Sequence, residues 1–213
     1  MADVTIVQVK AGLTNSGGAT ATASFDSAAG TGIIAGVVVW AQNTRTLSSI
    51  TDDKGNTYTI GTDTNASDVH SCPFYVLVPI TGVVLVTATF SGTCQARVSL
   101  MECTTGIFAN QVGATGSSTT PSAGSYVASA GSAALTGSIV QDGVGSPPQY
   151  TVGGGWTILM NDGGGSWEEG SQYRLASGSI TGDMTVANTG PWSNSMITFS
   201  PSGSTGVRIP VGT

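Results

Sequence analysis

His70 is the only histidine of the chain, and Cys72 follows it two residues later. Histidine is the base in most nucleophilic dyads and triads, so this pair is the first place to look for catalysis. On an extended strand the two side chains share one face, roughly 6.5–7 Å apart along the backbone. A histidine beside a buried, inert cysteine explains the same pattern, and we favour that interpretation.

Metal sites have few candidate ligands. A zinc site needs three or four ligands, and one histidine with three scattered cysteines is a poor supply. Asp63, Asn65 and Asp68 offer oxygen atoms at a spacing that Ca²⁺ accepts, but no glutamate stands where a bidentate ligand is needed. Turns use the same residue types. We therefore expect no metal and no cofactor, with calcium at residues 63–68 as the alternative.

Carboxylate pairs could support glycoside hydrolysis. The candidates are Glu168 with Glu169, or Asp162 with Glu168. Adjacent glutamates on an extended chain point to opposite faces, which prevents direct cooperation. Glu102 is embedded in an apolar strand and could have a raised pKa, but it lacks a partner carboxylate. We expect solvated or hydrogen-bonded structural roles for all of them, no catalytic residue, and no enzymatic activity.

Tryptophans could form a sugar-binding surface. Trp167 stands in the polar stretch NDGGGSWEEG and is the best candidate for an exposed aromatic platform. Trp40, Trp156 and Trp192 stand in strand-like contexts, and we expect them to fill the core.

Cys72, Cys94 and Cys103 are an odd number of cysteines. If residues 72–79, 83–90 and 94–103 form a meander, Cys72 and Cys94 flank its middle strand, about 9.5 Å apart. That separation exceeds disulfide reach, and Cys103 lies at the other end of the sheet. We expect three free thiols, buried as small apolar residues.

The elements that must position these residues are all strands. No window shows capped helical periodicity, whereas alternation is clear in ATASF and VLVTATF, and GIIAGVVVW suits a central strand covered on both faces or an interface. We predict an all-β, antiparallel, jelly-roll-like β-sandwich of about 12–14 strands with essentially no helix. Residues 1–201 form a single domain and 202–213 an extended arm. Predicted strands are 3–10, 19–25, 33–41, 47–51, 56–60, 73–79, 83–90, 94–103, 133–140, 155–160, 170–176, 181–187, 194–199 and 206–211.

Three connections stand out between these strands. DDKGNTY, residues 52–58, reads as a hairpin turn in which Gly55 and Asn56 take positive φ. The low-complexity stretch 104–132 is interpreted as a long loop crossing between sheets. Residues 161–170 are interpreted as a second, exposed loop.

The amino-acid composition excludes some classes of binding partner. Only 8% of the 213 residues are charged and the formal net charge is −6, so the chain has no basic patch for nucleic acid or for anionic membranes. The hydrophobic 39% is clustered into runs, which favours a folded protein over a disordered one. MADVTIVQVKAG lacks the features of a secretory leader, so we expect either that the chain stays where it is made or that the sequence is that of a mature or truncated protein.

Several motifs stand in a familiar order: DDKGNTYT, FYVLVPITGVVLVTATFSG, RVSLMECTTG, QYRLAS and WSNSMITFSP. Together they resemble a family of jelly-roll-like β-sandwich domains found in phage structural proteins and in bacterial secreted proteins. The resemblance covers roughly residues 48–201. Where that family has E-Y-S-G, this chain has Glu102-Cys103-Thr104-Thr105-Gly106. The motifs are turn and core positions, so the resemblance implies a fold and supplies no catalytic residue.

Three functions remain as hypotheses. The first is a virion structural protein, a phage capsid cement or decoration protein made in the host cytoplasm, which would bind capsid or other virion proteins and self-associate, for example as a trimer. Residues 1–18 and 202–213 are the expected contacts. The second is an extracellular carbohydrate-binding or adhesin-type module, with a glycan as partner. The third is a jelly-roll hydrolase, for which no carboxylate pair can be placed.

Overall fold

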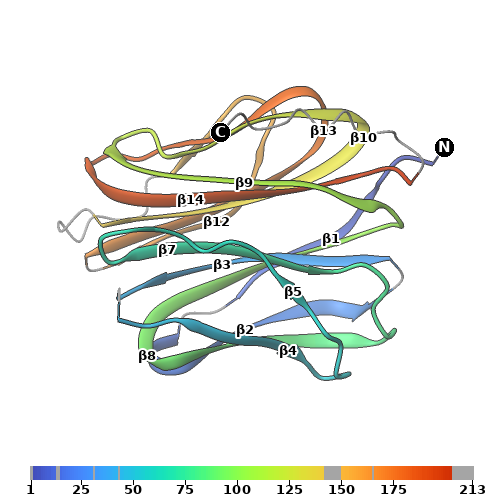
Figure 1. Ribbon diagram of the computed structural model, residues 1–213, viewed down its shortest axis with the longest axis horizontal. Coiled ribbons are helices and arrows are strands. Elements are labelled where there is room, and N and C mark those ends of the chain that lie inside the picture. Colours follow the sequence, from blue (N-terminus) through green and yellow to red (C-terminus); the bar gives the residue numbers. More distant parts are fainter. Residues whose placement is uncertain are drawn as a thin grey trace.

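The computed structural model describes residues 2–12, 15–30, 32–42, 44–141, 150–164 and 166–202. In these residues the chain forms strands and no helix (Figure 1). The predicted arm 202–213 lies outside the described residues apart from Ser202. The strands are β1 (Ile6–Ala11), β2 (Asn15–Ala29), β3 (Ile33–Ala41), β4 (Leu47–Asp52), β5 (Thr59–Ile60), β6 (Thr64–Ala66), β7 (Val69–Val76), β8 (Val83–Cys103), β9 (Ile107–Ser118), β10 (Ser122–Gln141), β11 (Thr151–Val152), β12 (Thr157–Gly164), β13 (Trp167–Thr185) and β14 (Gly190–Ser200).

The first half of the chain, β1 to β8, builds one antiparallel sheet. Its inner part has the order β1-β8-β3-β7-β5, with β6 also on β7. The early residues of the long β8 belong to an outer layer instead, where they pair with β2 and β4. Strand order and layering are those of an eight-stranded jelly roll.

The second half, β9 to β14, repeats this arrangement. Its inner order is β9-β14-β10-β13-β12, and the outer layer joins the early part of β10, the late part of β13, and β11. A shift in strand register also occurs at the equivalent place in both halves. The register shifts between Ile6 and Gln8 where β1 meets β8, and between Phe199 and Thr198 where β9 meets β14. The two halves are therefore structural repeats, with Ile6 corresponding to Phe108.

The inner sheets of the two halves pack face to face. β7 lies on β14, β3 on β10 and β1 on β12. Exchanging the halves leaves the β3–β10 pair in place and turns β7 on β14 into β13 on β8, two strands that Arg97 and Glu169 join. The molecule therefore has an approximate two-fold arrangement, with β2 and β4 on one outer side and the folded-over ends of β10 and β13 on the other (Figure 1). The predicted all-β antiparallel sandwich is confirmed.

Three layers of core follow from this stacking. One apolar cluster, which includes Trp40 and Phe74, lies inside the first half, and another around Met196 and Ile180 lies inside the second. A third joins residues of both halves between the inner sheets. β3 is buried at all nine positions, as expected of a central strand covered on both faces.

The two predicted loops are wrong. Residues 104–132 contain β9 and the start of β10, and residues 161–170 contain the end of β12 and the start of β13. Their small residues misled the prediction. Ala123 and Ala128 are buried between closely packed layers, where larger side chains would not be needed to fill the space.

The predicted meander and hairpin are also wrong. Residues 83–103 form one strand, and β3 lies between β7 and β8. The three cysteines are nevertheless free and buried, as predicted. Gly55 has a φ of 80° as expected, but Asn56 does not have the positive φ predicted for it. Because β4 pairs with β8 and β5 with β7, residues 52–58 connect two layers and form no hairpin.

Candidate functional site

A groove runs along one edge of the molecule, where β1 of the first half lies over β12 and β13 of the second. Its volume is about 520 Å³. The walls are residues 5–9 from β1 and the turn before it, Gly155 and Thr157 from the start of β12, and Tyr173, Arg174 and Leu175 from β13.

The opposite edge shows why a groove forms here. There Tyr75 of β7 stacks on Phe108 of β9, with ring centroids 4.9 Å apart, and closes the gap between the halves. Tyr173 occupies the position of Tyr75 in the second half, since each tyrosine pairs with the third residue of the central strand segment, Ala35 or Leu135. Its counterpart across the gap is Ile6 instead of an aromatic ring, so this edge stays open.

The groove is apolar at its rim. Val7 is 52% exposed and Leu175 is 57% exposed, and both line the groove from different halves of the chain. One cation is present: the Arg174 guanidinium lies 5.6 Å from the centre of the Trp156 ring. Among the described strands β1 pairs with β8 alone and β12 with β13 alone, so both walls end in strand edges with free backbone groups.

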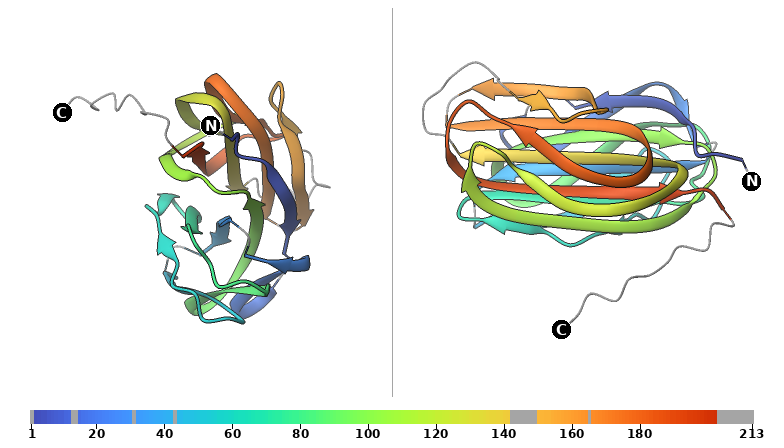
Figure 2. Two further views of the ribbon diagram at one scale, coloured as in Figure 1. Left: turned by 90° about the vertical axis from the view of Figure 1, so that its right-hand side faces the viewer. Right: turned by 90° about the horizontal axis from the view of Figure 1, so that it is seen from above.

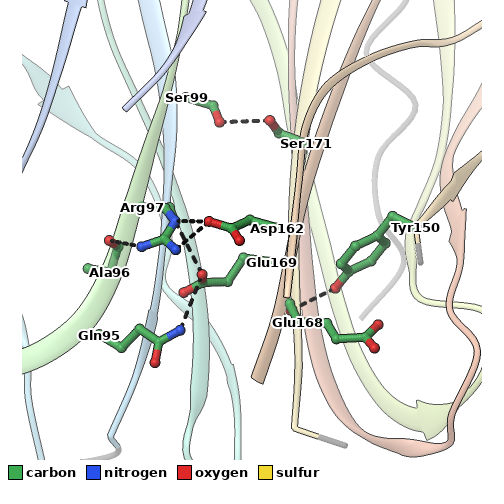
Figure 3. A network of polar contacts seen from close by, with 9 residues as sticks. All are labelled: Gln95, Ala96, Arg97, Ser99, Tyr150, Asp162, Glu168, Glu169 and Ser171. Carbon is green, nitrogen blue, oxygen red and sulfur yellow. Dashed lines mark hydrogen bonds and ion pairs between the residues drawn. The ribbon is translucent and has the colours of Figure 1, made fainter. Parts of the chain in front are cut away.

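Behind this edge an ionic cluster joins the two inner sheets (Figure 3). Arg97 of β8 donates from Nε to Asp162 Oδ2 of β12 at 3.0 Å and lies 3.4 Å from Glu169 Oε2 of β13. Gln95 donates to the same Glu169 oxygen. Ser99 and Ser171 bridge the halves nearby at 2.7 Å. The cluster pairs the Arg97 charge with carboxylates of both β12 and β13 and so ties β8 to the second half of the chain.

Asp162 and Glu169, two of the acidic residues considered from the sequence, therefore pair with Arg97 between the inner sheets. Glu168 and Glu169 are both about 1% exposed, so of the two expected roles, solvated or hydrogen-bonded, Glu169 has the hydrogen-bonded one through Gln95. Their side chains point to opposite faces, as predicted, with Glu168 turned away from Arg97 on the side of Tyr150 (Figure 3). Burial raises the pKa of the Glu169 carboxyl to about 7, although Arg97 and Gln95 oppose the shift.

His70 and Cys72 each contact other groups. The His70 ring stacks on Trp40, with centroids 4.5 Å apart, and its Nδ1 lies 2.9 Å from Asp63 Oδ2. The Cys72 thiol donates to the carbonyl of Gly61, and burial raises its pKa to about 12. A thiol in this environment is protonated and unreactive at neutral pH.

The remaining candidates have structural contacts. Glu102 is buried and accepts hydrogen bonds from the backbone N–H of Gly30 at 2.8 Å and from Gln8 Nε2 at 2.7 Å. Of the proposed calcium ligands, Asp63 binds His70, while Asn65 and His70 are paired across β6 and β7. Within the described residues no group of three or more histidine, cysteine or acidic side chains is placed to hold a metal ion.

The tryptophans follow the sequence interpretation in three cases of four. Trp40, Trp156 and Trp192 are buried in the cores of their own halves. Trp167 is half-buried and packs against the core between the inner sheets, so it presents no open platform.

Sequence reasoning missed Val7, Tyr173 and Leu175, the apolar residues of the groove. Val7 sits at a register shift, which turns an alternating strand residue outward. Tyr75 and Tyr173 stand in similar strands, and this similarity could have indicated the repeat. The difference between Ile6 and Phe108 explains the open edge, but it is visible only when the two halves are compared in the structure.

No protein-family model and no curated protein matches this chain. In the described part of the chain no helix is long and apolar enough to cross a membrane.

Proposed function

We propose that this protein is a non-enzymatic structural component of a virion, a phage capsid cement or decoration protein that binds neighbouring capsid subunits. Its partners are capsid or other virion proteins, and copies of itself. The proposal places the protein in the virion after synthesis in the host cytoplasm. The groove between β1 and β12–β13 is the observation that carries it.

The groove has the properties of a protein-binding surface. Val7 and Leu175 remain exposed at its rim, and the neighbouring edges of β1 and β12 offer backbone donors and acceptors to an added strand. A partner segment in extended conformation would bury both apolar side chains and satisfy those backbone groups. The two packed jelly rolls hold the walls in fixed positions, so little conformational entropy is lost on binding.

The family resemblance points the same way, since phage structural proteins are among the chains that share its turn and core motifs. Jelly rolls also occur in lectins and enzymes, so the fold alone does not select this function. The sparse charge suits a surface that binds proteins through apolar and backbone contacts instead of nucleic acid.

Co-sedimentation with capsids of the source virus, assembled without this protein, tests the proposal. Wild-type protein should sediment with the particles, and the double variant Val7→Asp/Leu175→Asp should bind at least about tenfold more weakly, because two exposed apolar contacts become charged. Val127→Asp is the matched control, since Val127 is 62% exposed in the outer layer and is not among the residues that line the groove. Equal binding of all three proteins, or no binding by the wild type, would refute the proposal.

A second candidate is a carbohydrate-binding or adhesin-type module acting outside the cell. The groove favours it through Tyr173, whose ring could stack on a sugar, and through Arg174 beside it. A glycan array separates the two functions. Binding of a glycan that is lost in Tyr173→Ala and kept in Tyr126→Ala would establish the second candidate.

A further inference from the structure

A second apolar surface lies at the end of the molecule where β7 turns into β8. Leu77, Val78 and Pro79 of this turn line a hollow of about 300 Å³, opposite Thr105 and Gly106. Val78 is 91% exposed, and the neighbouring Ile80 and Ile107 are 57% and 40% exposed. We call residues 77–80 and 105–107 the corner patch.

The corner patch is held in place from three sides. The backbone N–H of Ile80 donates to Asn56 Oδ1 at 2.7 Å, which links the patch to the turn after β4. The N–H of Gly82 donates to the carbonyl of Ala29 at 2.7 Å. Beside it, Gly30 is fixed by Glu102. Exposed apolar residues on so constrained a turn form a preorganised surface.

The fold does not require this turn. In the second half the equivalent passage from inner to outer layer has no loop, because β13 runs unbroken through it with the small residues Ser177, Gly178 and Ser179 at the crossing. The same jelly roll is thus completed by small, exposed residues in one half and by a protruding apolar turn in the other. The need to complete the fold therefore does not explain why residues 77–80 carry exposed apolar side chains.

The chain itself supplies a fitting occupant. β14 ends beside the patch: the carbonyl oxygen of Ser200 lies 2.9 Å from the point where a side chain on Gly106 would begin. The residues that follow read GSTGVRIPVGT, with Val207, Ile209 and Val211 alternating on one face if the segment is extended. Gly203 to Gly206 would span up to about 13 Å, enough to reach past the corner.

We infer that the corner patch of each copy binds residues 207–211 of a second copy, so that two molecules exchange these segments. β14 ends at the end of the molecule where the N-terminal residues also lie (Figure 2), and eleven residues of the chain, 203–213, follow the described part. Reciprocal exchange uses both apolar surfaces twice in one closed, symmetric contact. The inference rests on the self-association included in the proposed function.

Cross-linking tests this pairing in the full chain. The variant Val78→Cys/Ile209→Cys should give a covalent dimer on oxidation with copper phenanthroline, seen on a non-reducing gel. The three native cysteines are buried and serve as an internal background. Val127→Cys/Ile209→Cys, with the first thiol on the outer layer, should give no dimer. A cross-link within one chain, or none, overturns the inference.

Sedimentation velocity provides the second test. Val78→Asp and Ile209→Asp should each weaken self-association by about tenfold or more. A mixture of the two variants should form heterodimers, because an intact patch on one copy meets an intact segment on the other. Absence of heterodimers, or a wild type that stays monomeric, overturns the inference. Capsid binding is measured on the same variants: if it persists while dimers are absent, the segment exchange is wrong and the proposed function stands.

Discussion

Glu169 is the residue whose chemistry is most altered by the fold. Burial raises its pKa to about 7 against the effects of Arg97 and Gln95, while Asp162 nearby adds to the rise. The folded protein therefore binds a proton more readily than the unfolded chain between about pH 4.5 and 7. The stability from this group is complete below its unfolded pKa and is lost as pH rises through 7.

Glu169→Gln should remove that loss. We expect the free energy of unfolding of the variant, relative to wild type, to rise by on the order of 3 kcal/mol between pH 4.5 and pH 8. Urea denaturation across this range measures it. Asp26→Asn removes a carboxylate whose side chain is 77% exposed and should show no such trend. A difference that is flat with pH, or that falls, would contradict the assignment.

The cysteines make a second prediction at the scale of single residues. Burial raises the pKa of the Cys72 and Cys103 thiols to about 12 and that of Cys94 to about 11. In native protein at pH 8, DTNB should therefore label none of them within minutes, and denaturation in guanidinium should release three reactive thiols. Rapid labelling of one thiol without unfolding would show that its pocket opens.

At the scale of elements, the contacts in the turn after β4 explain why the residues of the motif D-x-x-G-N-x-Y have this spacing. The Asp52 carboxylate accepts hydrogen bonds from the Asn56 side chain at 2.7 Å and from the Tyr58 hydroxyl at 2.8 Å. Burial opposes ionisation, but these bonds hold the pKa of Asp52 below its usual value. The spacing D-x-x-G-N-x-Y thus fixes a turn between two layers.

Asn56→Ala tests the importance of this turn. It removes the bond to Asp52 and the one that Ile80 donates to Asn56, so we expect a loss of about 1–3 kcal/mol in the free energy of unfolding. Thr57→Ala, at an exposed neighbouring position, should stay within about 0.5 kcal/mol of wild type. If the two variants are equally stable, the turn contributes little and the corner patch is not held by Asn56.

Strands were easier to predict than their connections, for a physical reason. β3 was placed with its correct bounds because a run buried on both faces has a distinctive composition. β8 was divided in two because Ser91 and Gly92 resemble a turn, although here the strand bends from the outer layer to the inner one. Local residue types do not distinguish these outcomes, since the choice depends on which strands are available to pair. The groove was unpredictable for the same reason, because its walls lie more than 140 residues apart.

At the scale of the whole molecule, the approximate two-fold arrangement allows the open edge with the groove to be compared with the equivalent closed edge. One edge between the halves is closed by Tyr75 and Phe108, and the other is open between Tyr173 and Ile6. Repeats related by an approximate two-fold arrangement would be expected to close both edges in a similar way. The difference of one aromatic side chain therefore defines the surface through which we propose that the protein binds its partner.

Ile6→Phe should close the open edge by giving Tyr173 the stacking partner that Tyr75 has. Because an aromatic pair adds about 0.5–1.5 kcal/mol beyond its area burial, we expect the variant to be at least as stable as wild type. Yet it should lose capsid binding at the groove, since the space for a partner is filled. The reverse change, Phe108→Ile, should lower stability and leave binding intact. Thermal unfolding and co-sedimentation measure the two effects, and an Ile6→Phe variant that is folded and still binds fully would show that the partner contacts another surface.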